Sequence, residues 1–257
     1  MRTLLILIKK DLLDQFRSKK IIILIFTFLF VAISSVVIAK VLPQILGAIP
    51  STPGLIIDLP TPTYKDAIDQ FVKNLSQLAI FVLVFLVAGA IADEKNKKTL
   101  ELVLTKPVSR SLFVLSKFKA YFLSITAIYL ISALIFYFYT CTTFAVFGFG
   151  HFFLMTLLIL IYLILICAAT IFFSTILTNS ILAAVGGFGT MIILGTIWGL
   201  IDKIKDYSPY QLVSNYQNII ASGWDGNLLW PLIISLLLII VFVLSSMALF
   251  RQQEVER

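Results

Sequence analysis

The chain has 257 residues, of which 60% are hydrophobic and 13% are charged, and its mean hydropathy is +1.04. Soluble domains carry about a quarter charged residues, and residues 120–201 contain no Asp, Glu, Lys or Arg, so a soluble fold is not expected. The net charge of +7 does not indicate nucleic acid, because Lys and Arg stand in short clusters beside apolar stretches, as in membrane proteins. The composition therefore predicts an all-α polytopic membrane protein.

Residues 1–20 predict an amphipathic helix on the inner leaflet of the membrane. A cleaved secretory signal is not favoured, because the basic pair follows the first short apolar stretch instead of preceding it. The helix could simply anchor the chain, or it could transmit motion from a cytoplasmic partner. Its apolar positions are Leu5, Ile8, Leu12, Leu13 and Phe16, and the opposite, polar face is expected to contain Lys9, Lys10, Asp11 and Asp14.

Six stretches are long enough to cross a membrane, since a helix needs roughly 20 apolar residues to span a hydrocarbon core about 30 Å thick. Polar residues and glycines at 140–151 and 178–180 divide the long uncharged region into separate helices. The predicted spans are residues 21–42, 76–92, 120–139, 152–177, 181–200 and 230–250.

Charge asymmetry predicts the orientation of these spans. With the N-terminus inside the cell, 15 Lys and Arg residues fall on the cytoplasmic side and 5 on the other. Both termini and residues 93–117 are therefore expected to be cytoplasmic, in a multi-pass protein of the plasma membrane. Residues 43–75 and 201–229 are expected to be extracellular loops. The first of these is predicted to begin as an extended, proline-containing loop, with residues 64–75 forming an interfacial turn before the second span.

Several catalytic classes have no visible machinery in the chain. No glycine is followed by lysine, so the P-loop pattern GxxxxGK[ST] is absent. The single histidine, His151, is followed by Phe152, which excludes HExxH, and GxSxG does not occur. Cys141 and Cys167 are too few and too separated to indicate a metal site. The sequence predicts no catalytic residue, no metal site and no cofactor bound by this chain.

Five glycines make the fifth predicted span unusually smooth: Gly186, Gly187, Gly189, Gly195 and Gly199. Small residues allow helices to approach closely, so this span is expected to pack tightly, either within the chain or across a dimer.

The segment 93–117 is the largest predicted cytoplasmic connection. It places Leu100, Val103 and Leu104 on one face of a short helix that should end near Pro107. An apolar face exposed in the cytoplasm indicates a docking surface for another protein.

The same segment resembles the first cytoplasmic loop of the permeases of type-2 ATP-binding-cassette (ABC) exporters. In that family an acidic residue is followed by Gly-Thr-Leu-Glu-Leu-Leu, a Pro-x-Ser-Arg turn and a Gly-Lys pair that opens the next span. Lys98 and Ser116 stand where the family has glycine. Residues 9–20 are similar to the elbow helix of the family, and residues 208–220 to its outer loop. The matching positions are Glu94, Thr99, Leu100, Glu101, Leu102, Pro107, Ser109, Arg110 and Lys117.

The resemblance implies a single permease domain, 1–257, that is not itself an enzyme. A separate ABC ATPase subunit would bind ATP and Mg²⁺, and a second permease chain, identical or different, would complete the pathway within membrane lipid. Two other functions remain open: a membrane scaffold that recruits a cytoplasmic partner, and a nucleotide-independent channel or carrier. The resemblance also implies an elbow helix, with Lys9, Lys10, Leu12, Leu13 and Phe16 as its residues. The implied ATPase-docking residues lie in a coupling helix within the segment 93–117 and are Glu94, Lys95, Lys98, Thr99, Leu100, Glu101, Val103, Leu104, Pro107 and Arg110.

Overall fold

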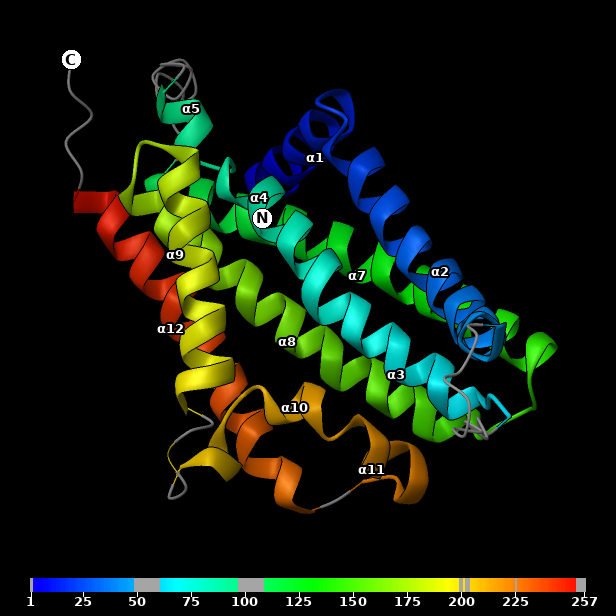
Figure 1. Cartoon of the computed structure of the whole chain (residues 1–257). Coiled ribbons are helices and arrows are strands. Elements are labelled where there is room, and N and C mark those ends of the chain that lie inside the picture. Colours follow the sequence, from blue (N-terminus) through cyan, green and yellow to red (C-terminus); the bar gives the residue numbers. More distant parts are fainter. Residues whose placement is uncertain are drawn as a thin grey trace.

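The computed structural model describes residues 2–48, 61–96, 109–198, 201, 204–224 and 226–252. All regular elements within these ranges are helical (Figure 1). Five helices are long and apolar enough to cross a membrane, and a sixth apolar helix, α9, is shorter in the described part of the chain. The prediction of an all-α polytopic membrane protein is confirmed.

The described helices fall into long elements that build the bundle and short elements between them. The helices of the bundle, in chain order, are α1 (Arg2–Arg17), α2 (Lys20–Ala48), α3 (Tyr64–Asn74), α4 (Ile80–Ala88), α5 (Ala92–Asn96), α7 (Arg110–Thr143), α8 (Phe149–Ile176), α9 (Ser180–Ile192) and α12 (Leu229–Gln252). Between them lie two π-helical turns, η1 (Leu75–Ala79) and η2 (Ile193–Ile197), and the short elements η4 (Lys205–Tyr207), α10 (Gln211–Ser214), α11 (Tyr216–Ser222) and η5 (Gly226–Leu228).

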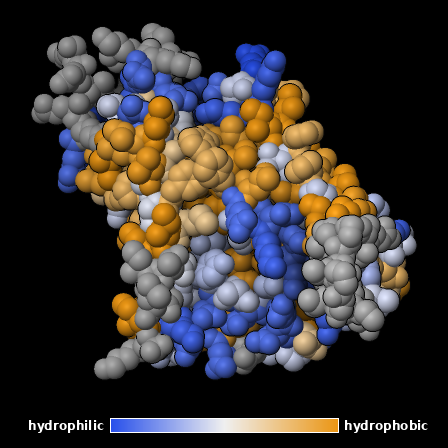
Figure 2. Space-filling view, viewed as in Figure 1, coloured by the Kyte–Doolittle hydropathy of each residue, from blue (hydrophilic) through white to orange (hydrophobic). Residues whose placement is uncertain are grey.

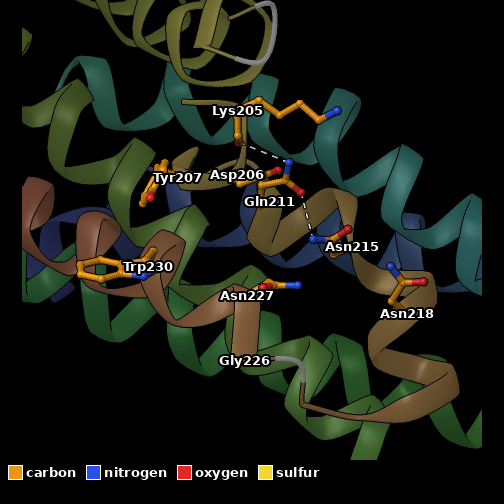
Figure 3. A pocket seen from close by; sticks show the side chains of 9 residues that line it. All are labelled: Lys205, Asp206, Tyr207, Gln211, Asn215, Asn218, Gly226, Asn227 and Trp230. Carbon is orange, nitrogen blue, oxygen red and sulfur yellow. Dashed lines mark hydrogen bonds between the residues drawn. The ribbon is translucent and has the colours of Figure 1, made fainter. Parts of the chain in front are cut away.

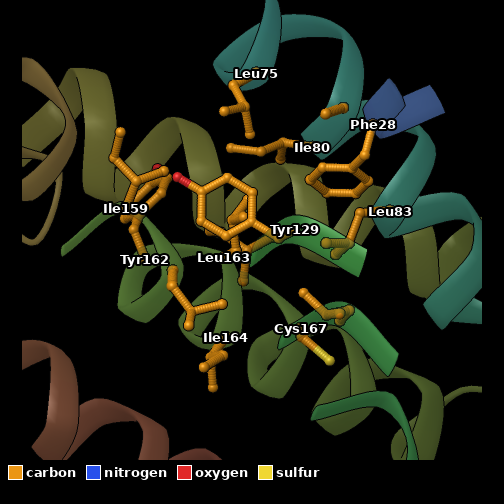
Figure 4. Close-up of a cluster of buried hydrophobic side chains, with 14 of the residues drawn as sticks. Phe28, Leu75, Ile80, Leu83, Tyr129, Ile159, Tyr162, Leu163, Ile164 and Cys167 are labelled. Carbon is orange, nitrogen blue, oxygen red and sulfur yellow. The ribbon is translucent and has the colours of Figure 1, made fainter. Parts of the chain in front are cut away.

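Helix α8 forms the core of the bundle, because α4, α7, α9 and α12 all pack on it. Of its most apolar stretch, 78% is buried within the chain, whereas the corresponding value for α12 is 11%. Figure 4 shows Tyr129 of α7 and Tyr162 of α8 among the buried aliphatic side chains around α8. Most apolar side chains of α12 therefore lie on the outside of the bundle, and those of α8 hold the bundle together.

The second predicted span is longer than its apolar run, because helical structure begins at Tyr64 and continues through α3, η1 and α4. Thr63 caps the start: its backbone N–H and its hydroxyl donate to Asp66 Oδ2 at 2.7 and 2.9 Å. The inner face of α3 is buried, and Phe71 stacks on Phe136 with ring centroids 4.1 Å apart. The interpretation of residues 64–75 as an interfacial turn is therefore replaced by a helix with one buried face.

The prediction that an extended loop begins at Pro43 is wrong, because α2 continues through Pro43 to Ala48. A proline near the end of a helix removes one backbone hydrogen bond without ending the helix when the preceding turns are already formed. The rest of that loop, residues 49–60, lies outside the described residues.

The glycines of α9 pack inside the chain. A Cβ atom added at Gly187 would come within 2.5 Å of Thr170 Oγ1 on α8 and 2.9 Å of Val84 Cγ1 on α4. A Cβ atom at Gly186 would overlap the ring of Phe173. By contrast, Gly189 has nothing within 4 Å. Of the two alternatives for this smooth span, packing within the chain accounts for Gly186 and Gly187.

The two ends of the bundle differ in composition. In Figure 1, α1, α5 and the last turn of α12 lie at one end, and α10 and α11 lie at the other. Figure 2 shows polar residues gathered over α3, α10 and α11, with apolar residues covering α2 and α9. Helix α1 and the last turn of α12 therefore lie at the same end of the bundle, opposite α10 and α11.

Helices α10 and α11 are fixed to the bundle by polar contacts. His151 at the start of α8 donates from Nδ1 to the carbonyl oxygen of Ile220 at 3.2 Å. Gly223 ends α11 with φ +81°, a conformation that favours glycine, and it lies against the His151 ring. Ser208 donates to the carbonyl oxygen of Leu194 at 2.7 Å. The short helices thus form an ordered cover at this end of the bundle.

Candidate functional site

Four charged side chains meet at the end of the bundle that contains α1 and α5. They are Lys10 and Asp11 of α1, Glu94 of α5 and Lys117 of α7, and we refer to them as the charge cluster. Lys117 Nζ lies 2.5 Å from Glu94 Oε1 and 3.0 Å from Asp11 Oδ1. Lys10 Nζ lies 3.9 Å from the same two oxygens. One ammonium group of α7 therefore binds carboxylates from two other elements.

The charge cluster is buried although it is ionic. The side chains of Lys117 and Asp11 are 5% and 2% exposed, and that of Glu94 is 17% exposed. Burial of a single charge would be costly, but two carboxylates surround the Lys117 ammonium, and Ser116 donates to Asp11 Oδ2 at 2.8 Å. The cost of burying each charge is thus offset by the other members of the cluster. The charge cluster therefore fixes α1 and α5 relative to α7.

Helix α1 has a different orientation from the one the sequence suggested. Asp11, expected on the polar outer face, lies instead on a buried face against α7, together with Gln15, which accepts a hydrogen bond from Ser124 at 2.8 Å. The expectation fails because the polar partners of this face belong to α7, more than 100 residues away in the chain. The apolar side chains that α1 leaves exposed are those of Leu5, Ile6, Leu13 and Phe16.

The residues predicted for the elbow helix are mostly on the exposed face of α1 and not on the face buried against α7. Lys9, Lys10, Leu13 and Phe16 are exposed, and Leu12 is half-buried. An exposed row of apolar side chains beside basic ones suits a helix at the membrane interface. Only Lys10, among these five, takes part in the charge cluster.

The turn that leads into α5 is held by α8. Ser174 accepts hydrogen bonds from the N–H groups of Ile91 and Ala92, both at 3.0 Å, and donates to the carbonyl oxygen of Ala88 at 2.6 Å. Gly89 leaves room in this turn for Asp93, because an added Cβ would lie 2.1 Å from the present position of its carboxylate and would move that side chain aside. Asp93 in turn lies 3.7 Å from Lys20 Nζ of α2.

Two further predicted docking residues contact the ends of other helices. Lys95 Nζ donates to the carbonyl oxygen of Thr175 in α8 and lies 5.8 Å from the centre of the Phe250 ring. Arg110 Nη1 donates to the carbonyl oxygen of Arg251 in α12 at 3.3 Å. Lys98, Thr99, Leu100, Glu101, Val103, Leu104 and Pro107 lie outside the described residues.

The two flanks of residues 97–108 therefore reach four helices. Glu94 contacts α1 and α7, Lys95 contacts α8, and Arg110 contacts α12. These polar contacts connect both flanks of the segment with the ends of other helices.

The sequence identifies Lys117 only as part of the family pattern and does not predict that it binds Asp11 and Glu94. A local signal does exist, since Lys117 stands three and four residues from Phe113, Val114, Ala120 and Tyr121, all of which are buried. A lysine at that spacing belongs to the inward face of a helix, where it needs a carboxylate partner. Asp11 and Ser174 carry no comparable signal.

Among the described residues no three His, Cys, Asp or Glu side chains come together as a metal site would require. The charge cluster holds α1, α5 and α7 together through ion pairs around one ammonium group.

Comparison with known proteins covers almost the whole chain. The sequence model of the family described as ABC-2 family transporter protein matches residues 5–255, from α1 to beyond α12. The chain is also similar to the uncharacterized transmembrane protein YxlG of Bacillus subtilis (strain 168), with 23% identity over 262 residues, which is 99% of each chain.

Proposed function

Because the chain belongs to the ABC-2 family of transporter proteins, we propose that it is the permease subunit of an ABC exporter that is driven by a separate ATPase subunit. The family match supports a multi-pass transport component that is not itself catalytic. In this proposal ATP and Mg²⁺ bind to the ATPase. Two permease chains associate, and the transport pathway runs between the two chains.

The observation that carries the proposal is the set of contacts on either side of residues 97–108. The ATPase would dock on this segment, and nucleotide-driven movement of the ATPase would displace α5 and the start of α7. Through Glu94 and Lys117 the displacement would reach α1, and through Lys95 and Arg110 it would reach α8 and α12. The permease would then open or close its pathway by tilting helices that already share these contacts.

The proposed orientation places the charge cluster in the cytoplasm of the cell. The excess of Lys and Arg on that side supports this placement. Helix α1 would lie at the inner leaflet of the plasma membrane with Leu13 and Phe16 against lipid. Helices α10 and α11 would then face the outside.

Copurification tests the proposal directly. An ABC ATPase coexpressed with this chain should copurify with it, and its ATP hydrolysis should change on binding. Glu101→Ala and Arg110→Ala should weaken binding, whereas Lys65→Ala, at the opposite end of the bundle, should not. The proposal is refuted if no ATPase copurifies, or if both docking variants bind as the wild type does. Binding without any ATP-dependent step would indicate the scaffold function instead.

A further inference from the structure

A polar pocket lies at the end of the bundle opposite the charge cluster. It is an open hollow of about 590 Å³, lined by η4, α10, α11, η5 and the start of α12 (Figure 3). Pockets for small molecules measure roughly 300–1,000 Å³, so the space is sufficient for a ligand of moderate size. None of its lining residues takes part in the contacts proposed for coupling.

Carboxamides provide most of the polar lining. Gln211, Asn215, Asn218 and Asn227 come from three different segments and lie around the same space (Figure 3). The Gln211 side chain donates to the carbonyl oxygen of Lys205 at 3.3 Å and accepts from Asn215 Nδ2 at 2.9 Å, so two of the amides are held in place. A carboxamide both donates and accepts hydrogen bonds, as a hydroxyl group does.

Asn218 is the amide that is available to a ligand. Its side chain is exposed, and it forms no hydrogen bond within the part of the chain that the structure describes. It also lines a second hollow of about 360 Å³ on the other side of α11, beside Asp69 of α3. Asn218 is the lining residue that the two hollows share, and Gln217 lines only the second.

Two aromatic rings form another wall of the pocket. Tyr207 and Trp230 are both exposed, and their ring centroids lie 6.1 Å apart with an interplanar angle of 60°. Exposed rings beside hydrogen-bonding groups suit a ligand that has an apolar face and a polar edge. Tyr and Trp are also the residues that gather at the level of lipid headgroups.

The charges at the pocket indicate a neutral ligand. Lys205 and Asp206 contribute one positive and one negative charge, so the described lining carries no excess of either sign. A phosphate would be expected to meet several basic groups, and an ammonium several acidic ones. Hydroxyl groups are ligand groups that can both donate to and accept from carboxamides without requiring a net charge.

We propose that this pocket binds a sugar, whose hydroxyl groups contact Asn218 and Asn227 and whose apolar face lies on Trp230. The sugar has two sources, a soluble oligosaccharide or the headgroup of a glycolipid in the surrounding membrane. The proposal does not depend on the ATPase, because binding requires only this chain.

Binding to the full chain, purified without sugar-based detergent, tests the proposal in two arms. In phosphatidylcholine nanodiscs the chain is titrated with maltotriose, and the dissociation constant is measured by calorimetry. In nanodiscs that also contain digalactosyldiacylglycerol, the glycolipid retained by the chain is measured by native mass spectrometry. Saturable binding is expected in at least one arm, and the arm identifies the source of the sugar.

Two pairs of variants show whether binding occurs in this pocket. Asn218→Ala should weaken binding about three- to tenfold, the effect of one lost hydrogen bond. Trp230→Leu should weaken it about tenfold or more, because an aromatic anchor is lost. Gln217→Ala is the control on the same helix, since Gln217 points to Asp69 at 3.3 Å, and Trp224→Leu is the control for an exposed indole outside the pocket.

The proposal is overturned by any of three results. These are no saturable binding in either arm, binding that the Asn218 and Trp230 variants leave unchanged, and binding that the control variants weaken equally. Failure of the chain to bind an ATPase would bear on the proposed function and not on this pocket.

Discussion

Replacing Lys117 with methionine removes the ammonium group at the centre of the charge cluster. Lys117→Met keeps the length of the side chain but leaves Asp11 buried without its ion pair 3.0 Å away, and Glu94 without its own partner 2.5 Å away. Removing one partner of a buried pair costs about 3–5 kcal/mol. Since Lys10 lies 3.9 Å from both carboxylates and compensates part of the loss, we expect the lower part of that range.

The assay measures the thermal unfolding midpoint of the purified chain in detergent. After heating to a series of temperatures, the fraction that remains folded is measured by size-exclusion chromatography. A loss of this size should lower the midpoint by on the order of 10 °C. The double variant Asp11→Leu with Lys117→Met should recover part of the loss, because an apolar pair often replaces a buried ion pair without penalty.

Lys119→Met is the matched control, because Lys119 is exposed on the same helix two residues further along. Its effect should stay within about 0.5 kcal/mol. Equal midpoints for the Lys117 and Lys119 variants would refute the reasoning, since the buried ion pairs would then contribute nothing to the position of α1 and α5. A double variant that is less stable than the sum of its single variants would also contradict it.

Three other substitutions test the packing around α8. Gly187→Ala should lower stability by about 1–3 kcal/mol through overlap with Thr170 and Val84, whereas Gly189→Ala, which meets open space, should not; equal unfolding midpoints for the two would contradict the packing. Tyr162→Phe should leave the midpoint unchanged or raise it slightly, because the buried hydroxyl has no partner in the described structure and its removal ends a desolvation cost; a clear loss of stability would reveal a missed hydrogen bond. Ser174→Ala should cost about 1–3 kcal/mol, since two N–H groups before α5 lose their acceptor, and hydrogen exchange at Ile91 and Ala92 should accelerate; unchanged exchange would exclude this role.

Hydropathy alone predicted the existence of the membrane helices, because lipid leaves no solvent for backbone amides and so requires helices of about 20 apolar residues. The same argument could not predict which helices are buried within the chain. Helices α8 and α12 are similar in hydropathy, yet the first is mostly buried within the chain and the second mostly faces outward. Apolar side chains are equally stable against lipid and against protein, so hydropathy does not distinguish them.

The ends of helices were less predictable than their centres. Tyr64 begins a helix because Thr63 and Asp66 form a capping box and because Ile68 and Phe71 find a buried face, a pairing that depends on α7. Apolar run length registers only the part of a helix within the hydrocarbon, so it missed the twelve residues from Tyr64 to Leu75.

The sequence singled out some members of the candidate site but not the contacts between them. The family pattern pointed to Glu94, Lys95 and Arg110, and each of them contacts the end of another helix. Asp11 was assigned to a solvated face, because amphipathic patterning treats every carboxylate as exposed, and its partner Lys117 is distant in the chain. Contacts between residues so far apart require the fold to be known.

The central claim is that residues 97–108 form the docking site of an ATPase, and crosslinking tests it most directly. The photoreactive residue p-benzoylphenylalanine is introduced in place of Leu104, and, as a control on the exposed face of α1, in place of Leu13, in cells that also express the candidate ABC ATPase. We predict an adduct between the chain and the ATPase from position 104 and none from position 13. Absence of that adduct, or labelling of position 104 by a membrane-impermeant reagent from outside the cell, would contradict the account.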